Sequence, residues 1–493
     1  MNPMRCLPAL LLLLPGTVAA QQSRALSLED ALRLALPASE SLELAKTAVE
    51  RSRGDHYRAA SGRWPQFTAQ LGYTRLLRSQ FEGFNFGGDS AGTGAGSAGT
   101  DQLPFGQRNT FNLGLNATWP LFSGGRVSGE IQAADAQRRS ADLGLTSAEA
   151  QVTLEVVQAY YNAVSADYSV RIAEILVQQA DTTLRQTEQR RAAGTQPEFE
   201  LLRARVARGN SRTELIARQV ERDVAYLDLR RLLGVPLTEA VTLTTSLIDT
   251  AAAVQTPTLL RILSQPIDTS VERRVVVRQA AEGVEAQEGL ARATKSERWP
   301  QLNLNSIYGR VGYPGNLDPF QPEYFTNWDV SVGISLPIFT GGRLRGNRIA
   351  ADAAVDDARL RLQQITELAQ VDTRSALAEL RAAEAAWEAS QGTVEEGQRA
   401  YEIAELRFRE GLSTQVELLD AREALARAEL LRLASARALG IARVRVALLP
   451  YLPIAATLGV TPNAALPTTT TAAGMTATGR TAGTSNIRTG TTP

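Results

Sequence analysis

The chain has 493 residues, and its 52 basic and 52 acidic side chains leave a formal net charge of zero. That balance argues against nucleic acid as a partner. Cys6 is the only cysteine and His56 the only histidine. The sequence therefore predicts no disulfide framework, no Cys/His metal site and no cofactor. We expect His56 to be a solvated surface residue of a helix rather than a ligand or a base.

The first 20 residues have the pattern of a secretory signal peptide. Arg5 precedes an apolar run over residues 7–14, and the small residues Val18 and Ala20 stand just before Gln21. Cys6 precedes the apolar run, so no lipid anchor is predicted. Beyond this segment no uncharged apolar stretch approaches the ~20 residues of a transmembrane helix. Any membrane-spanning part must therefore consist of strands.

The chain contains an internal duplication, which sets its expected organisation. The motif WPLFSGGR at 119–126 recurs as LPIFTGGR at 336–343, an offset of 217 residues. Upstream, RWPQ at 63–66 recurs at 298–301, an offset of 235 residues. The difference falls in the first copy, within the Gly/Ser-rich stretch 83–99, where a surface loop can absorb extra chain.

Two short helices are expected before the first strand. Ser27, with Asp30 three residues later, forms a capping box that opens the first. Residues 37–62 are predicted to form the second.

Four segments alternate apolar and polar residues with period two, which indicates strands. They cover residues 66–73, 111–119, 302–308 and 328–336. Their length of about seven to nine residues approaches that of a tilted strand crossing a bilayer. An antiparallel sheet packed on a soluble core would show the same alternation and stays open as an alternative.

The end of each strand pair carries the repeated Pro-x-Phe-x-Gly-Gly motif. The prolines are expected to end the strand pairing, and the glycine pairs to let the chain turn into a helix. These predicted junction residues are Pro120, Gly124 and Gly125 in the first copy, and Pro337, Gly341 and Gly342 in the second.

Long runs without proline follow, at about 125–191 and 343–409. Helices of this size would be roughly 100 Å long, and their 3/4 apolar spacing is typical of coiled coils. Gly194 and Gly411 are expected to end them. Thr195 with Glu198, and Thr414 with Glu417, are expected to cap return helices that run to about Leu233 and Leu449.

Helix lengths indicate how each half is completed. Residues 37–62 and 196–233 would give ~38 and ~57 Å, which together match one long helix. Residues 269–296 and 413–448 would complete the second half in the same way. Each half is therefore predicted to be a long helix beside two stacked short ones.

The predicted segments follow in chain order: signal peptide 1–20, helices 21–62, strands 63–122, helical hairpin 123–235, equatorial segment 236–267, short helix 268–298, strands 299–340, second hairpin 341–449 and a C-terminal segment 450–493 that is disordered from about 462.

Four strands cannot close a barrel, and open strand edges are not tolerated in lipid. The chain must therefore oligomerise if its strands cross a membrane; this geometry leaves dimer, trimer and tetramer open. The resulting hollow assembly would be a conduit. With one histidine and no nucleophile constellation, the chain is not expected to be an enzyme.

The ordered set of motifs resembles the TolC-like outer-membrane efflux channel family over the chain to about Pro453. The matching motifs are LSLEDAL near the start, WPQ before two strands, both Pro-x-Phe-x-Gly-Gly-Arg copies, and RFREG followed by QVELLDAR around Gly411. The resemblance implies a mainly α fold with a transmembrane β part: a long coiled-coil α-barrel, and four strands per chain that complete a trimeric 12-stranded barrel. It also implies a location in the outer membrane of a Gram-negative bacterium, with a large periplasmic part.

Partners follow from the same resemblance. They are two further copies of the chain, outer-membrane lipid, a periplasmic adaptor (membrane fusion protein), and an inner-membrane pump or ABC exporter reached through the adaptor. The hairpin tips would dock the adaptor, through Gly194, Thr195, Gly411, Ser413 and Thr414.

The resemblance places a periplasmic gate at the same tips. Its acidic positions fall on Glu417 and Asp420, so a trimer would gather six carboxylates that favour cations. The first-copy positions are Glu200 and Arg203, and we expect Arg203 to form an ion pair that locks the closed state. Ordinary solvated coiled-coil charges are the alternative for all four residues.

A secreted periplasmic coiled-coil adaptor or scaffold is the alternative function. It would share the secretion and the helices, but would not need four strands of membrane length. The sequence does not identify the exported substrate, which could be a drug, metal, dye or protein.

Overall fold

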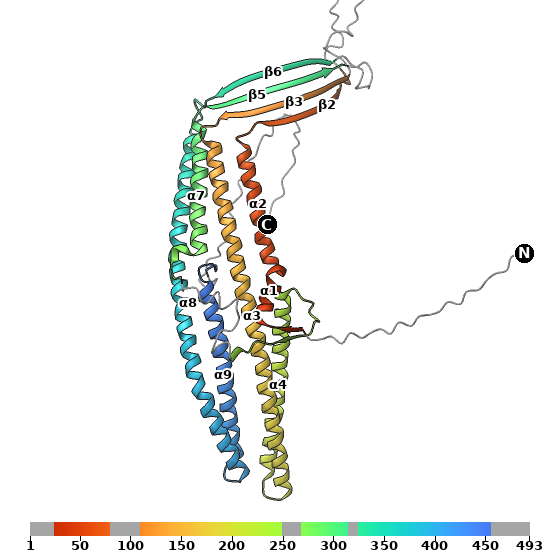
Figure 1. Ribbon diagram of the computed structural model, residues 1–493, viewed down its shortest axis with the longest axis vertical. Coiled ribbons are helices and arrows are strands. Elements are labelled where there is room, and N and C mark those ends of the chain that lie inside the picture. The colour runs from red at the N-terminus through yellow and green to blue at the C-terminus, as the bar shows by residue number, and fades with distance from the viewer. Residues whose placement is uncertain (1–23, 79–108, 249–267, 314–323, 455–493) are drawn as a thin grey trace, which may run out of the picture. The chain divides into compact units, whose positions relative to one another are not determined.

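The computed structural model describes residues 24–78, 109–248, 268–313 and 324–454. They belong to one unit that ends at Ile454. In this unit a four-stranded sheet is joined to long helices that run side by side (Figure 1). The predicted signal peptide, the Gly/Ser-rich stretch 83–99 and the C-terminal tail from 462 lie outside the described residues.

The two predicted long helices are confirmed. They are α3 (Arg126–Ala192) and α8 (Arg343–Arg409), each of 67 residues, and their ends coincide after a shift of 217. Each follows two glycines with positive φ, 62° and 98° before α3 and 59° and 89° before α8. Glycine adopts these angles without steric cost, which lets the chain turn from strand to helix. Among the described residues, no helix is both long and apolar enough to span a bilayer.

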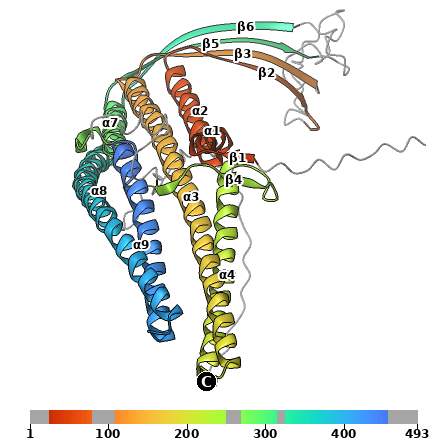
Figure 2. The same ribbon diagram turned by 60° about the horizontal axis from the view of Figure 1, so that its bottom comes forward.

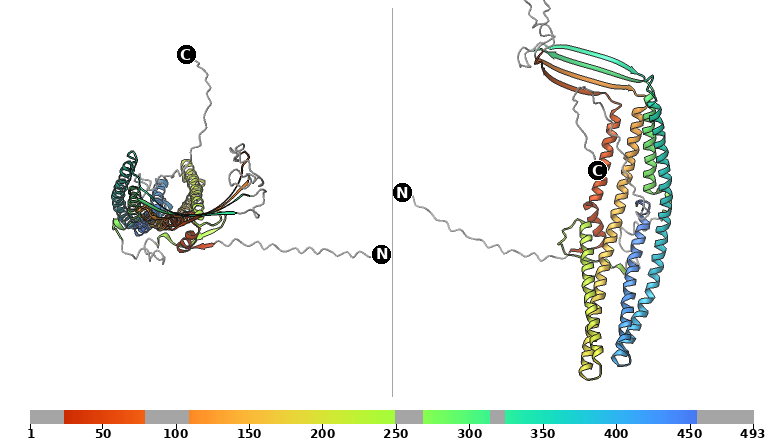
Figure 3. Two further views of the ribbon diagram at one scale, coloured as in Figure 1. Left: turned by 90° about the horizontal axis from the view of Figure 1, so that it is seen from above. Right: turned by 180° about the vertical axis from the view of Figure 1, so that it is seen from behind.

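Two short helices stack along each long helix, as the lengths predict (Figures 1 and 3). On α3 these are α2 (Glu40–Ser61) and α4 (Glu198–Leu233). On α8 they are α7 (Val275–Lys295) and α9 (Gln415–Leu448). Both α7 and α9 also contact α3, so the two halves form one packed unit.

Two predicted helix starts are wrong. The second helix begins at Glu40, because Pro37 lies inside α1 (Leu28–Ala38) and Ser39 caps α2 by accepting from the Leu42 N–H at 3.4 Å. A serine hydroxyl can accept a hydrogen bond from a free N–H of the first helical turn, which Pro37 cannot do, so α2 starts after Ser39. In the second half, a 3₁₀ turn at Val271–Arg273 delays the start of α7 to Val275.

The predicted capping box of α1 is present. Ser27 Oγ accepts from the Asp30 N–H at 3.1 Å and donates to the Asp30 carboxylate at 2.7 Å. That hydrogen bond lowers the pKa of Asp30 below its ordinary value.

His56 is not the fully solvated residue that the sequence suggests. Its Nε2 lies 3.3 Å from Oδ1 of Asp135 on α3, and its side chain is only 29% exposed. The pair joins α2 to α3. No cluster of three or more His, Cys, Asp or Glu side chains suited to a metal occurs in the part of the chain described.

The four strands form one antiparallel sheet in the order β2-β3-β5-β6. The strands are β2 (Gln66–Arg75), β3 (Asn109–Phe122), β5 (Gln301–Gly312) and β6 (Tyr324–Ser335). They are 10 to 14 residues long, longer than the periodicity predicts, because pairing extends past the alternating core of each run.

The role predicted for Pro120 is wrong. β3 continues through Pro120, which lies opposite Asn303, to Phe122, and a register shift between Pro120 and Phe122 absorbs the irregularity. A bulge is one of the few places where a sheet accepts proline. In the second copy β6 ends at Ser335, before Pro337, as predicted.

Cross-strand pairing divides the sheet into two faces. One row on what we call the apolar face joins Ala69, Leu115, Tyr308 and Trp328. The next row on the same face joins Phe67, Ala117, Ser306 and Val330. The opposite, polar face carries Gln66, Gln70, Asn112, Asn116, Asn303, Asn305 and Ser331. The residues described leave the apolar face uncovered: Phe67 is 79% and Trp328 70% exposed.

The strand register repeats the duplication to the residue. β2 pairs with β3 as Gln66↔Thr118, and β5 pairs with β6 as Gln301↔Ser335. Shifting Gln66 by 235 and Thr118 by 217 gives the second pair. The same two offsets therefore relate both strands and helices of the two halves.

Midway along the helices, the first half is closed by an apolar core. α1, β1 (Arg24–Leu26) and β4 (Val241–Leu243), the last two paired in parallel, lie against α3 (Figure 2). The buried Tyr160 hydroxyl donates to the Leu26 carbonyl at 3.0 Å and accepts from the Thr245 N–H at 3.1 Å. Burial raises the pKa of Tyr160 and keeps this donor protonated.

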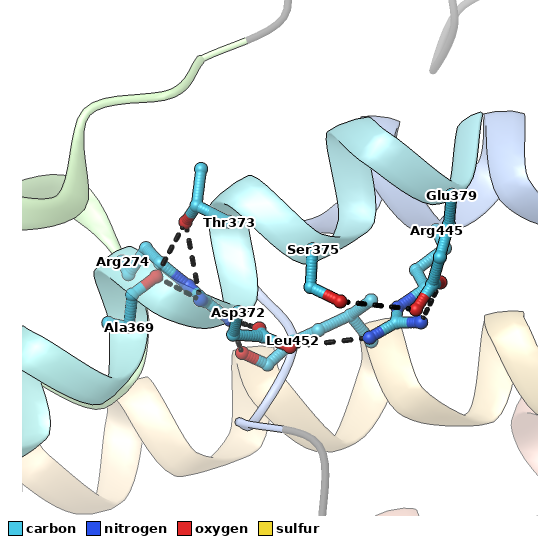
Figure 4. Close-up of polar contacts among 8 residues, drawn as sticks. All are labelled: Arg274, Ala369, Asp372, Thr373, Ser375, Glu379, Arg445 and Leu452. Atoms are coloured by element: carbon cyan, nitrogen blue, oxygen red, sulfur yellow. Dashed lines mark hydrogen bonds and ion pairs between the residues drawn. The ribbon is translucent and has the colours of Figure 1, made fainter. Parts of the chain in front are cut away.

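In the second half, charged side chains join α7, α8 and α9 where the two short helices meet (Figure 4). Arg274, the N-cap residue of α7, lies 2.7 Å from Asp372 on α8, and both side chains are at most 4% exposed. Arg445 on α9 lies 3.3 Å from the other Asp372 oxygen and also pairs with Glu379. Arg274 further donates to the Ala369 carbonyl at 3.1 Å. One carboxylate thus joins three helices.

Candidate functional site at the helical tips

The first hairpin tip turns at Gly194, directly after α3. Gly194 has φ 74°, and the Thr195 N–H reaches back to the Arg190 carbonyl at 3.0 Å, which closes the helix end. The capping box predicted at Thr195 is wrong. Pro197 occupies the N-cap position of α4, and the Thr195 hydroxyl instead donates to the Arg190 carbonyl at 2.9 Å. Thr195 therefore ends one helix rather than starting the next.

The second tip keeps the predicted capping. Gly411 has φ 75°, and the Leu412 N–H donates to the Arg407 carbonyl at 2.8 Å. Thr414 is the N-cap of α9, and its hydroxyl oxygen accepts from the Glu417 N–H at 3.4 Å. Ser413 Oγ is buried without a partner in the described chain. The two tips of the duplicated hairpin are thus built differently.

The predicted acidic pair lies on the outside of its hairpin. Glu417 and Asp420 are both exposed, one turn apart, while Leu418 between them is 5% exposed and packs inward. Residues three apart share a helix face, so the two carboxylates project in the same direction. Glu417 accepts a hydrogen bond from the Thr414 hydroxyl at 3.4 Å, and neither carboxylate forms an ion pair with a described residue, so both can face another surface or a water-filled space.

The first-copy positions are partly enclosed. Glu200 and Arg203 lie in the first turns of α4, and both are intermediate in exposure. No ion pair joins Arg203 to a carboxylate of the described residues, so the expected lock is not present within one chain. Any such pair must come from another copy.

Two contacts that the sequence did not suggest clasp the tips together. Arg190 on α3 donates to the carbonyls of Phe408 and Arg409, both at 3.0 Å, and its guanidinium lies 4.9 Å from the Phe408 ring centroid. With its nitrogen toward Glu200, the amide of Gln415 donates to the Glu200 carboxylate at 2.8 Å and carbonyl at 3.2 Å. We refer to these two contacts as the tip clasp.

A signal for the clasp exists in the duplication. A shift of 217 aligns Phe408 with Arg191, and Gln415 with Glu198. Phe408 and Gln415 are each only 2% exposed. The second copy thus carries an aromatic and an amide where the first copy carries charges, beside a turn where large side chains are usually solvated.

At the other end of the long helices, the first junction is tightly packed and the second is open. A Cβ on Gly124 would lie 2.7 Å from Trp299 Cβ, whereas one on Gly341 would meet nothing within 4 Å. Arg343, at the start of α8, pairs with Glu297 at 2.9 Å. Gly124 is therefore required for packing as well as for its φ.

Comparisons with known proteins agree with this architecture. The family model described as "Outer membrane efflux protein" matches residues 31–235 and 267–449, one match in each half. The pyoverdine export outer membrane protein OpmQ of Pseudomonas aeruginosa is 24% identical over 408 residues, 81% of this chain and 79% of the relative. OpmQ of Pseudomonas putida is 26% identical over 261 residues, and the aligned part spans only about half (51%) of each protein.

The fold is that of solved outer-membrane channels. The CmeC outer membrane channel of Campylobacter jejuni superposes with a TM-score of 0.67 at 18% identity, covering 87% of this chain and 86% of CmeC. Since the family model covers most of both halves, the chain belongs to the outer membrane efflux protein family.

Proposed function

We propose that three copies of this chain form a passive outer-membrane channel of an efflux pump or type I secretion system. The sheet carries this proposal. Within the described chain both of its edge strands, β2 and β6, lack an outer partner, and its apolar face is uncovered. In lipid, unpaired strand edges are very costly, so the sheet must close through further copies. Three copies would give twelve strands, consistent with the family.

The duplication predicts how neighbouring copies meet. Within one chain, β3 of the first half pairs with β5 of the second, with Ala117 opposite Ser306. The same offsets lead from Ala117 to Ile334 on β6, and from Ser306 to Leu71 on β2. If every boundary between halves is built alike, Ile334 of one copy lies opposite Leu71 of the next.

The helices give the same boundary independently. Gly129 on α3 and Gly289 on α7 touch so closely that a Cβ on Gly129 would lie 2.5 Å from the Gly289 carbonyl oxygen. Their counterparts are Gly346 on α8 and Gly54 on α2, and a Cβ on either would meet nothing within 4 Å. We infer that Gly346 packs against Gly54 of the next copy.

An apolar stripe on α4 supports this boundary nearer the tips. It consists of Val206, Ile216, Val220 and Val224, which are 55–62% exposed. On α8, Leu360 and Val371 are similarly exposed. In the proposed ring, α8 of one copy covers α4 of the next, as α9 covers α3 within the chain.

We place the gate at the tips. Glu417 and Asp420 from three copies would form a ring of six carboxylates, and the tip clasp would hold the two hairpins of each copy in the closed arrangement. The ring would favour cations over anions. Arg203 remains available to a carboxylate of a neighbouring copy.

Planar-bilayer recordings test the gate. We expect the double variant Glu417→Ala with Asp420→Ala to raise single-channel conductance and to weaken block by divalent cations. Glu405→Ala, an exposed acid on α8, the other helix of the same hairpin, is the matched control and should conduct as the wild type. Equal conductance of all three proteins would remove the gate from these residues.

A cheaper experiment separates a channel from a soluble scaffold. A trimeric barrel should fractionate with outer membranes and run as a heat-modifiable, SDS-resistant band three times the chain mass. A chain found in the soluble periplasmic fraction would overturn the proposal and favour the adaptor or scaffold alternative.

The partners are proposed from the family alone. A periplasmic adaptor would dock on the two turns, at Gly194, Thr195, Gly411, Ser413 and Thr414, and would connect the channel to an inner-membrane pump or ABC exporter. Site-specific photocross-linking in cells from position 412, where Leu412 is 72% exposed in the same turn, with identification of the captured protein by mass, tests this docking. Capture of no inner-membrane-anchored adaptor would contradict it.

A further inference from the structure

The apolar face of the sheet contains a groove of about 530 Å³ that crosses all four strands. Its lining comes from Phe67, Ala69, Leu115, Ala117, Ser306, Tyr308 and Trp328, with Thr68 and Asn116 between them. The groove is open along one side rather than enclosed. It thus has the shape of a trough on the surface that would meet the membrane.

Side-chain sizes explain the groove. Ala117 and Ser306 face each other across β3 and β5 and form a low floor. The next row raises a wall of Leu115, Tyr308 and Trp328. The Trp328 Nε1–H donates to Ser306 Oγ at 3.1 Å. This bond pairs the indole N–H with the hydroxyl oxygen, and most of the lining is carbon, so the trough suits a hydrocarbon chain.

Two arginine side chains lie beyond one end of the groove. Arg310 follows Tyr308 by two residues on the same face, about 7 Å further along β5, and is exposed. Its guanidinium lies 5.2 Å from the Tyr324 ring centroid, which fixes its direction. Arg75, also exposed, ends β2 on the same face.

No carboxylate balances these charges on the apolar face of the described strands. The single acid of the four strands, Asp329, lies opposite Ile307 on the polar face and accepts from Asn327 at 2.8 Å. The apolar face therefore presents an apolar trough followed by arginine, an arrangement complementary to an acyl chain with an anionic headgroup.

We propose that this groove binds one acyl chain of a phosphorylated lipid of the outer leaflet, lipid A, with Arg310 on its phosphate. The inference rests on the proposed function, which puts the strand ends farthest from the helices (Figure 2) at the outer surface. Arginine binds phosphate through two parallel hydrogen bonds, and its charge draws anionic headgroups to that end of the groove.

The chain supplies a matched control at the other end of β5. Arg298 also stacks on an aromatic ring, 5.6 Å from the Trp299 centroid, but that site lies next to the helices and has no groove lining beside it. If an arginine anywhere near the membrane surface is sufficient to bind lipid A, Arg298 and Arg310 should contribute equally to its retention. If the groove is required as well, only Arg310 should contribute.

Native mass spectrometry of the purified full chain in detergent, titrated with lipid A, tests the proposal. We expect Arg310→Gln to weaken lipid A retention about fivefold, the loss expected for one cation near a lipid surface. Ser306→Leu should weaken it by filling the floor of the groove, and Arg298→Gln should leave it unchanged.

Three outcomes would overturn the inference: equal losses for Arg298→Gln and Arg310→Gln, equal retention of phosphatidylglycerol and lipid A, or full retention by Ser306→Leu. Each variant is also recorded in planar bilayers. If the variants conduct normally and still bind lipid A as tightly as the wild type, only the proposed lipid site is wrong. If the wild-type protein shows no channel activity, the proposed function is wrong.

Discussion

The two halves of the chain share the length of their long helices and differ most at the point where their short helices meet. α3 and α8 have the same length and coincide end to end after one shift. At mid-length, however, the first half is closed by an apolar core that includes Tyr160, Leu229 and Leu233. The second half is closed by Arg274, Asp372 and Arg445.

The N-caps make the difference concrete. Shifting Ser39, the N-cap of α2, by 235 gives Arg274, the N-cap of α7. Serine satisfies the helix start with its hydroxyl, whereas a cation is unfavourable at a helix N-terminus. Asp372 offsets that charge. Duplication therefore preserved the lengths needed to keep the halves in step, while each joint acquired its own chemistry.

The largest expected effect comes from breaking the charged joint. Asp372→Asn leaves the buried Arg274 and the partly exposed Arg445 beside a neutral amide, and removing one partner of a buried pair costs about 3–5 kcal/mol. We expect a large fall in the thermal unfolding temperature, measured by circular dichroism at 222 nm. The counterpart variant Glu155→Gln should change it little, because in the described part of the chain Glu155 forms no ion pair and accepts one hydrogen bond, from Gln151 at an exposed site. Equal effects of the two variants would contradict the proposed difference between joints.

The next effect separates contacts within a chain from contacts between copies. Gly129→Ala would press a methyl group against the α7 backbone and should cost about 1–3 kcal/mol in the stability of the folded chain. The methyl group of Gly346→Ala would meet nothing within 4 Å in the described part of its own chain, so we expect it to lower only the temperature at which the SDS-resistant trimer dissociates. If Gly346→Ala left the trimer unaffected, the predicted packing against Gly54 of the next copy would be wrong.

A smaller effect is expected at the tip clasp. Arg190→Ala removes two charge-assisted hydrogen bonds to the second hairpin, each worth about 1.5–3 kcal/mol at most and less where exposed. The tips should open more often, which single-channel recordings would report as a higher open probability. Arg407→Ala, at the position duplicated from Arg190, should not change it. A higher open probability for Arg407→Ala than for Arg190→Ala would contradict the role proposed for the Arg190 contacts.

The smallest effect concerns pH. Partial burial raises the pKa of Glu429 on α9, whereas its counterpart Arg212 on α4 is exposed. A raised pKa in the folded state means that stability is lost as pH rises through it. Glu429→Gln should therefore raise the unfolding temperature slightly at pH 7 and leave it unchanged near pH 4, where the acid is largely protonated in both states. A gain that is equal at both pH values would contradict this.

Much of the fold could be predicted from the sequence because it depends on period and length. The duplicated motif, the alternating strands and the proline-free helices each produce a pattern that extends over many residues, so a few irregular positions do not obscure it. The errors occurred where local geometry competes: Thr195 caps the preceding helix, and Pro120 is absorbed by a bulge. The tip clasp and the Arg274 joint depend on residues more than 90 positions apart, which no local pattern reveals.

Disulfide trapping tests the closed ring most directly. The only native cysteine lies in the predicted signal peptide, so introduced pairs report cleanly. Leu71→Cys with Ile334→Cys should cross-link copies into a ladder that stops at three chains on a non-reducing gel. Ala117→Cys with Ser306→Cys, the equivalent pair within one chain, should give a monomer, and Leu71→Cys with Ser335→Cys, on opposite faces, should not cross-link. A ladder that runs beyond three chains would contradict the proposed trimer. Cross-linking by Leu71→Cys with Ser335→Cys, but not by Leu71→Cys with Ile334→Cys, would contradict the proposed register.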